Sequence, residues 1–96
     1  METVRVIARA VAREGKADEV KALLRRLIRP TRAERGCRYY ELFESNQPGL
    51  FYFHELWYSK EDLDAHAKSS HFTEILSQVK ELLKEPLEVN LLQEIE

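Results

Sequence analysis

The chain has 96 residues, 44% of them hydrophobic and 33% charged, which is the composition of a folded globular domain and excludes a disordered chain. Its formal net charge of −2 excludes a strong basic field for nucleic acid or an acidic membrane surface, and no segment approaches the ~20 apolar residues of a membrane span. The lone cysteine, Cys37, excludes an intrachain disulfide and a cysteine-based metal site. We expect one domain over residues 1–96, with no nucleic-acid or membrane partner, in a cytoplasmic, reducing compartment.

Residues 3–13 alternate between two faces and predict the first strand. One face carries Val4, Val6, Ala8, Ala10 and Ala12, and the other carries Arg5, Ile7, Arg9, Val11 and Arg13. Apolar residues then recur at helical spacing over 17–31 and predict an amphipathic helix, which Pro30 is expected to kink and Gly36 to end. The arginine-rich run at 25–38 is interpreted as a solvated helix face.

Residues 37–45 are rich in aromatic side chains and predict a second strand, and residues 50–58 predict a third, antiparallel to the second. The segment 46–49 between them is a turn, in which Pro48 presets the first central position and Gly49 supplies a positive φ at the next. One face of the third strand carries Phe51, Phe53, Glu55 and Trp57, and the other carries Leu50, Tyr52, His54, Leu56 and Tyr58.

Ser59 can cap a short helix, and Ser69-Ser70 can begin a longer one. The apolar stripe of the longer helix consists of Phe72, Ile75, Leu76, Val79, Leu82 and Leu83. Pro86 is expected to end that helix, and residues 87–95 alternate as a last strand. The order β-α-β-β-α-β, with the second helix split, predicts a ferredoxin-like α+β fold, in which helices cover one face of a four-stranded antiparallel sheet.

The second face of this sheet has no helix of the same chain to cover it. It carries Ile7, Val11, Tyr52, Leu56 and Tyr58, which is more apolar surface than a stable monomer leaves in water. A homodimer through this sheet face is the simplest arrangement that would cover it.

Four short motifs are similar to those of one known family. They are Gly36-Cys37, Glu55-Leu56-Trp57, Leu63-Asp64-Ala65-His66 and Ser70-His71-Phe72. Over essentially the whole chain, and most strongly from residue 36 to residue 72, the sequence resembles the antibiotic biosynthesis monooxygenase (ABM) family and in particular its small quinol-monooxygenase-like members. The resemblance implies a dimeric α+β barrel of two ferredoxin-like subunits, with a pocket between the sheet and the helices of each subunit.

The resemblance also implies a range of activities. Members of the family oxidise phenols, quinols or polyketide aromatics with O2 and with no metal or flavin, whereas others degrade haem or act on small sugar-derived signal molecules. Haem-degrading relatives carry an asparagine on the first strand, where residues 6–9 here read Val-Ile-Ala-Arg, so haem degradation is disfavoured. The implied function is a cofactor-free monooxygenase that oxidises a quinol, phenol or polycyclic aromatic.

The histidines are the candidate catalytic residues. His66 follows Leu63 by three residues, so both point toward the sheet and the layer that holds Trp57. An imidazole titrates near physiological pH, which suits a general base that takes a proton from a phenol or quinol, although a structural histidine at the helix-sheet boundary is the alternative. His71, at the start of the longer helix, is the second candidate base at the pocket rim. His54 faces the other side of its strand and is expected in the subunit interface.

Aromatic residues are the candidates for binding the substrate. The resemblance implies that Trp57 lines the cavity, where it would hold a flat ring together with Phe53 and Phe72. The alternative for Trp57 is that it only packs in the hydrophobic core. Tyr39 and Tyr40 lie on opposite faces of the second strand, so only one can look toward the helices. We favour Tyr40 as the hydroxyl that steadies a substrate oxygen.

Glu55 shares the buried face of the third strand, where a carboxylate needs a partner. We expect a helix lysine or arginine, or a helix N-terminus, to provide it, and a catalytic base is the alternative role. Glu55 is also a candidate substrate-binding residue, because it shares this face with Phe53 and Trp57. A metal ion is not expected, because His66 and His71 lie five residues apart, off the i, i+4 spacing of paired ligands on one helix face, and no third ligand is evident.

Two other functions stay open on the sequence alone. The first is an oxygen-independent isomerisation or breakdown of a small carbonyl metabolite by the same histidine. The second is non-catalytic binding of a quinone or another hydrophobic metabolite by the dimer. All three functions require an aromatic cavity with an imidazole at its rim.

Overall fold

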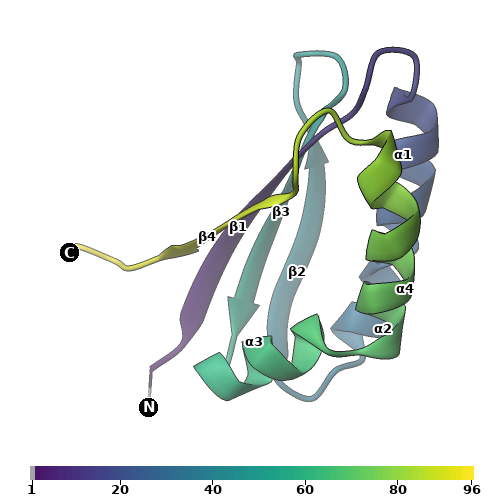
Figure 1. Ribbon diagram of the computed structural model, residues 1–96. Helices are drawn as coiled ribbons and strands as arrows, with labels where there is room; N and C mark the ends of the chain where they lie inside the picture. Colours follow the sequence, from purple (N-terminus) through teal and green to yellow (C-terminus); the bar gives the residue numbers. More distant parts are fainter. Residues whose placement is uncertain (1) are drawn as a thin grey trace.

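A four-stranded antiparallel sheet and a layer of helices make up the computed structural model, which describes residues 2–96 (Figure 1). In chain order the elements are β1 (Val4–Val11), α1 (Ala17–Arg25), α2 (Ile28–Arg32), β2 (Cys37–Glu44), β3 (Leu50–Trp57), α3 (Lys60–Ala67), α4 (Ser70–Val79), the 3-10 turn η1 (Lys80–Leu82) and β4 (Glu88–Leu92). The strand order is β2-β3-β1-β4, and the helices lie together on one face of the sheet. The predicted ferredoxin-like α+β fold is confirmed.

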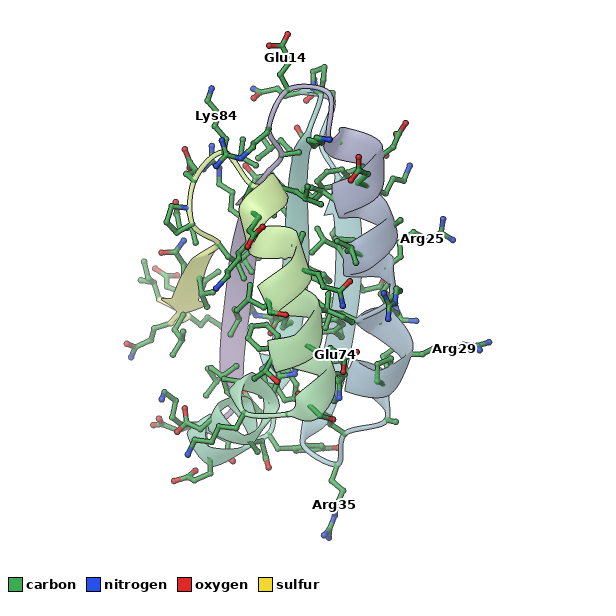
Figure 2. The ribbon with its side chains drawn as sticks, turned by 45° about the vertical axis from the view of Figure 1, so that its right-hand side comes forward. Glu14, Arg25, Arg29, Arg35, Glu74 and Lys84 are labelled. Carbon is green, nitrogen blue, oxygen red and sulfur yellow. The ribbon has the colours of Figure 1, made fainter. Side chains whose placement is uncertain are left out.

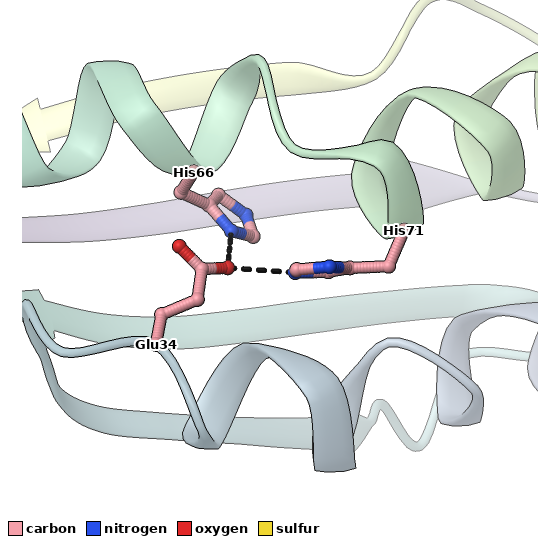
Figure 3. A group of neighbouring side chains, drawn as sticks. All are labelled: Glu34, His66 and His71. Carbon is pink, nitrogen blue, oxygen red and sulfur yellow. Dashed lines mark hydrogen bonds and ion pairs between the residues drawn. The ribbon is translucent and has the colours of Figure 1, made fainter.

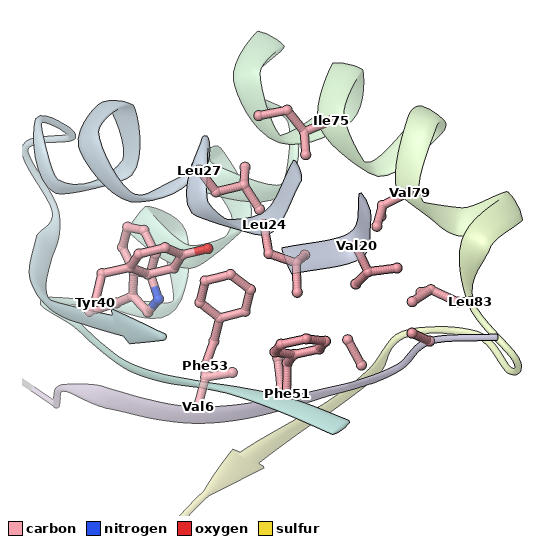
Figure 4. Close-up of a cluster of buried hydrophobic side chains, with 14 residues drawn as sticks. Val6, Val20, Leu24, Leu27, Tyr40, Phe51, Phe53, Ile75, Val79 and Leu83 are labelled. Carbon is pink, nitrogen blue, oxygen red and sulfur yellow. The ribbon is translucent and has the colours of Figure 1, made fainter. Parts of the chain in front are cut away.

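The register between β1 and β3 sets small side chains beside large ones on the helix-covered face. Ala8 lies opposite Phe53 and Ala10 opposite Phe51, and all four side chains are buried. With apolar residues of α1 and α4 they form one continuous core (Figure 4). An alanine fills much less volume than a phenyl ring, so β1 leaves room beneath the helices.

The first helical segment is broken in two shortly before Pro30. Proline has no N–H, so Pro30 cannot donate to the carbonyl of Arg26 four residues earlier. In the preceding turn the amide of Arg26 donates to the carbonyl of Leu23, and the amide of Leu27 to that of Leu24, each at 3.1 Å. These are tighter i to i−3 bonds. The expected kink is therefore confirmed, and it takes the form of a break between α1 and α2.

The predicted helix end at Gly36 is wrong, because α2 ends at Arg32 and Gly36 does not adopt a positive φ. This glycine permits a close approach instead, since a Cβ at its position would collide with the side chain of Asp62 in α3. The amide of Tyr58 also donates to the carbonyl of Gly36 at 2.9 Å. The loop between α2 and β2 is thereby held against α3.

The predicted turn and helix starts are confirmed. Gly49 has a φ of +79°. The Oγ of Ser59 accepts a hydrogen bond from the amide of Asp62 at 3.2 Å, and the Oγ of Ser69 accepts one from the amide of Phe72 at 3.3 Å. These N-caps fix where α3 and α4 begin, and so fix the positions of the two histidines that these helices carry.

The sheet face away from the helices exposes several large apolar side chains. Tyr39 and Phe43 of β2 and Tyr58 after β3 are 37%, 48% and 47% exposed. The first two add to the apolar residues that the sequence places on this face, since Tyr39 pairs with Leu56 and Phe43 with Tyr52. The outer face is therefore more apolar than predicted.

The arginines of the basic run are exposed, as predicted, although the run is not one helix face, because α2 ends at Arg32 and β2 begins at Cys37. Arg25, Arg29 and Arg35 project away from the helical layer (Figure 2). Within residues 2–96, no helix has the length and apolar character that crossing a bilayer requires.

Candidate functional site

A mostly apolar cavity of about 260 Å³ lies between the sheet and the helices. Its wall includes Ala8, Tyr40, Phe53, Glu55, His66 and Phe72. At β4 the wall is formed by Val89 and Leu91, each of which is 48% exposed. An apolar hollow with a few polar groups is the usual form of a small-molecule site.

His66 occupies the last turn of α3 and is 3% exposed. Its ring centroid lies 4.7 Å from that of Trp57, 4.9 Å from that of Phe72 and 5.7 Å from that of Tyr40. The imidazole thus lies among aromatic rings at the wall of the cavity, on the side of α3 predicted from its spacing to Leu63.

Glu34 is the site residue that sequence reasoning missed. It lies in the loop after α2, and one of its carboxylate oxygens, Oε2, is 2.7 Å from Nδ1 of His66 and 2.7 Å from Nε2 of His71 (Figure 3). The sequence placed it inside a basic run that was interpreted as solvated. The only feature of the sequence that could have indicated this contact is Gly36, two residues later. Because this glycine has no side chain, the loop lies close to α3, and Glu34 thereby lies next to the histidines.

This hydrogen bonding fixes the tautomers of both histidines. A carboxylate oxygen only accepts hydrogen bonds, so Nδ1 of His66 and Nε2 of His71 carry the hydrogen atoms. In neutral His66 the lone pair is then on Nε2. Burial lowers the pKa of His66 below its ordinary value, an effect that its hydrogen bond to Glu34 opposes in part, and this favours the neutral imidazole.

Glu55 is buried, as predicted, but its expected basic partner is wrong. Its Oε1 instead accepts a hydrogen bond from the indole Nε1 of Trp57 at 2.9 Å, two residues along the same face of β3. Burial raises the pKa of Glu55 to about 7, although the bond from Trp57 acts in the opposite direction. At neutral pH a large share of this cavity-wall carboxyl is therefore protonated.

Trp57 does not lie where the resemblance implies. It is fully buried and packs against His66, and the cavity wall does not include it. The ring of His66 and the side chain of Glu55 reach the wall while the indole lies behind them. His71 is likewise absent from the wall, since its imidazole turns toward Glu34.

The other candidate residues on β2 and β3 lie on the two faces of the sheet as the alternation of these strands indicates. Tyr40 is 2% exposed and lies at the cavity wall, where burial raises the pKa of its phenol and keeps it protonated. Tyr39 is on the outer face, 4.7 Å from the ring of His54. There His54 is also hydrogen-bonded to Arg5 at 2.6 Å, far from the cavity. Phe53, the other aromatic candidate on β3, is part of the cavity wall.

The expectation that the two histidines lack a third potential ligand is also wrong. Glu34, His66 and His71 each offer one ligand atom, and these atoms all lie within 4.8 Å of one another. The three residues come from the α2–β2 loop, α3 and α4, and are brought together by the fold rather than by spacing along one helix.

Residues 3–78 match the family model described as antibiotic biosynthesis monooxygenase, abbreviated ABM. The chain belongs to the ABM family. Two bacterial proteins are similar in sequence. "Putative monooxygenase Rv0793" of Mycobacterium tuberculosis is 43% identical over 89 residues, which cover 93% of this chain and 88% of that protein. "Putative monooxygenase YcnE" of Bacillus subtilis is 32% identical over 75 residues, covering 77% and 79%.

Solved structures of similar proteins have the same fold. That of Rv0793 superposes with a TM-score of 0.93 at 40% identity, covering 99% of this chain and 97% of the other. PA3566 from Pseudomonas aeruginosa gives a TM-score of 0.92 at 29% identity, covering 100% and 97%. The ABM match includes Glu34, His66 and His71, whereas the cavity residues of β4 lie beyond it.

Proposed function

We propose that this ABM-family protein is a cofactor-independent monooxygenase that oxidises a quinol, phenol or polycyclic aromatic with O2. The observation that carries the proposal is the pairing of Glu34 with His66. The carboxylate holds Nδ1–H of the imidazole and leaves Nε2 as the proton acceptor, at the wall of an apolar cavity.

Proton removal is the step that the protein has to assist. A neutral His66 takes the proton of the substrate hydroxyl at Nε2, and the resulting anion is electron-rich enough to pass one electron to O2. The two radicals then combine to form a carbon–oxygen bond and a hydroperoxide. When the O–O bond breaks, one oxygen stays on the ring and the other leaves as water. For a quinol the sum is quinol plus O2 giving hydroxyquinone plus water, with all electrons supplied by the substrate.

The other cavity residues have supporting roles. Phe53 and Phe72 present aromatic surface to a flat substrate, and Trp57 holds the His66 ring in place from behind. The protonated phenol of Tyr40 donates a hydrogen bond to a substrate oxygen. Glu55 in its protonated form donates to the peroxide oxygen that leaves.

We also propose that the protein is a homodimer through the outer face of the sheet. The apolar side chains exposed there, including Phe43 and Tyr58, support it, because a monomer would leave this contiguous surface in water. A second subunit on this face would bury them.

The experiment that tests the oxygenase proposal is a screen of chelator-treated protein against hydroquinones, naphthoquinols and anthrones. Oxygen uptake is measured with the enzyme-free autoxidation rate subtracted, and products formed under ¹⁸O2 are weighed by mass spectrometry. We expect uptake above background and one labelled oxygen atom in the product. Conversion without oxygen would instead establish an isomerase or degrading enzyme, and tight binding without product would establish a binding protein.

A further inference from the structure

We propose that Glu34, His66 and His71 form a binding site for a divalent transition-metal ion of the zinc type. The site lies behind His66, because His66 lines the cavity whereas Glu34 and His71 do not. It is distinct from the place where the substrate would bind, although the two share one imidazole ring.

The ligand set and its convergence carry the proposal. Nδ1 of His66 and Nε2 of His71 both aim at one oxygen atom, Oε2 of Glu34, at 2.7 Å each (Figure 3). Two imidazole nitrogens and a carboxylate oxygen are ligands that zinc accepts at about 2.0–2.2 Å, with water in the fourth position. An ion among them would occupy the place of the two shared hydrogen atoms.

The charge of the cluster favours a cation. The Glu34 side chain is 17% exposed, and within residues 2–96 the two histidines are its only ion-pair partners. A carboxylate this far out of water is costly without a compensating positive charge. A divalent ion supplies that charge directly.

The three ligands are held in place before any ion binds. The loop that carries Glu34 is fixed to α3 by the close approach of Gly36 to Asp62. The helix that carries His71 is fixed at its start by the Ser69 cap. The His71 side chain is 22% exposed, so an ion can enter from solvent without opening the core.

Metal binding has a consequence for His66. A metal on Nδ1 moves the hydrogen atom of the neutral ring to Nε2, so that the imidazole can no longer accept a proton at the cavity. The ion would therefore inhibit the oxygenation. This consequence rests on the proposed function, whereas the binding itself does not.

Binding is tested on the full chain after chelator treatment and without any substrate. Zn²⁺ is titrated by calorimetry and Co²⁺ by its visible absorption, which reports nitrogen and oxygen ligation. We expect one ion per chain, with affinity reduced at least about tenfold in Glu34→Gln and in His71→Gln. The matched control is His54→Gln, which removes the histidine on the outer sheet face and should bind like the wild type.

Several outcomes would overturn the proposal. They are a wild-type protein that binds neither ion, variants of Glu34 and His71 that bind as well as the wild type, and a His54 variant that loses as much affinity as they do. Circular dichroism establishes whether each variant is folded. If one of the two ligand variants, Glu34→Gln or His71→Gln, does not fold, the affinity of the other is enough to test the proposal. Zn²⁺ should also raise the melting temperature of the wild type and of His54→Gln, but not that of Glu34→Gln. Because no substrate is present, these results are independent of whether the protein is an oxygenase.

Discussion

Nδ1 of His66 lies 2.7 Å from Oε2 of Glu34, a residue 32 positions earlier in the chain, and Nε2 of His71 lies at the same distance from the same oxygen. One carboxylate from a loop thus orients two imidazoles from two helices. The more buried imidazole reaches the cavity, and the other lies between the first and solvent. The proposed chemistry depends on this arrangement more than on any single aromatic residue.

Replacing Glu34 with glutamine should lower activity strongly. The amide group can donate to Nδ1 of His66 and so stabilise the tautomer with the hydrogen atom on Nε2, which cannot act as a base. We expect kcat/KM on the substrate found in the screen to fall by about 10²- to 10⁴-fold, and the free energy of unfolding to fall by about 1–3 kcal/mol. Steady-state kinetics and urea unfolding measure the two effects.

Glu74→Gln is the control for this prediction, because Glu74 is exposed on α4 (Figure 2). It removes the same charge from the same region and should leave both quantities unchanged. Equal activity in Glu34→Gln and Glu74→Gln would show that the carboxylate has no role in the reaction.

Replacing Trp57 with phenylalanine should destabilise the protein through Glu55. The change keeps most of the apolar packing but removes the indole N–H, which donates a hydrogen bond to Oε1 of Glu55 with 2.9 Å between the nitrogen and the oxygen. We expect a loss of about 1–3 kcal/mol in the free energy of unfolding at pH 8, where the carboxylate is charged and unpartnered. Denaturant unfolding measures it, and a loss that is no smaller in the Glu55→Leu background, which has no acceptor for the indole, would contradict the coupling.

The stability of the protein should fall as pH rises from about 4.5 to about 7, to the extent that Glu55 controls it. Burial raises the pKa of this carboxyl from 4.5 to about 7, so the folded state binds more protons than the unfolded state in that window. Its contribution is fully present below pH 4.5 and is lost by about pH 7, a change of about 3 kcal/mol.

This pH effect is isolated by comparing the wild type with Glu55→Gln in urea unfolding across the window. The difference, Glu55→Gln minus wild type, should grow with pH, because glutamine is neutral throughout and its amide oxygen still accepts from Trp57. Parallel stability curves for the two proteins would show that the pKa of Glu55 is not raised.

Filling the cavity at Ala8 should block binding without unfolding the protein. Ala8→Leu adds three carbon atoms to the wall of a cavity of about 260 Å³, so the added volume enters empty space and should change stability by less than about 1.5 kcal/mol. We expect KM for an aromatic substrate to rise by about tenfold or more. Ala8→Ser is the control, because serine is close to alanine in size and should leave KM nearly unchanged. An unchanged KM in Ala8→Leu would show that the substrate does not bind in this cavity.

A charge on the outer face of the sheet should separate the proposed dimer. Leu56 lies there between β1 and β2, opposite Arg5 and Tyr39. Leu56→Arg places a cation in the centre of the proposed interface and should give a monomer in sedimentation velocity, where the wild type gives a dimer. Leu56→Met is the control, and a wild-type monomer would rule out this interface.

Much of the fold could be predicted because it depends on local patterns. The alternation of β1 identifies its buried face, and Ser59 and Ser69 mark the helix starts through hydrogen bonds to residues three positions ahead. His66 could be placed at the sheet by its spacing from Leu63. In each case the controlling interaction lies within one element or at its boundary.

The site was less predictable because its key contact is not local. Glu34 reaches the histidines only because Gly36 lets the loop approach α3, and no periodicity reports such an approach. The partner of Glu55 is on the same strand face, two residues away, and it is a neutral indole N–H rather than the basic residue that a buried carboxylate suggests. The position of Trp57 behind His66 depends on how α3 packs, which strand alternation does not specify.

The most direct test of the central claim is the oxygen-uptake rate of chelator-treated His66→Gln on a quinol that the wild-type protein oxidises. His54→Gln is measured beside it, and circular dichroism establishes that both are folded. We expect His66→Gln to lose about 10²- to 10⁴-fold in rate and His54→Gln to keep the wild-type rate. An unchanged rate in His66→Gln would show that this imidazole is not the base, and the proposed mechanism would be wrong.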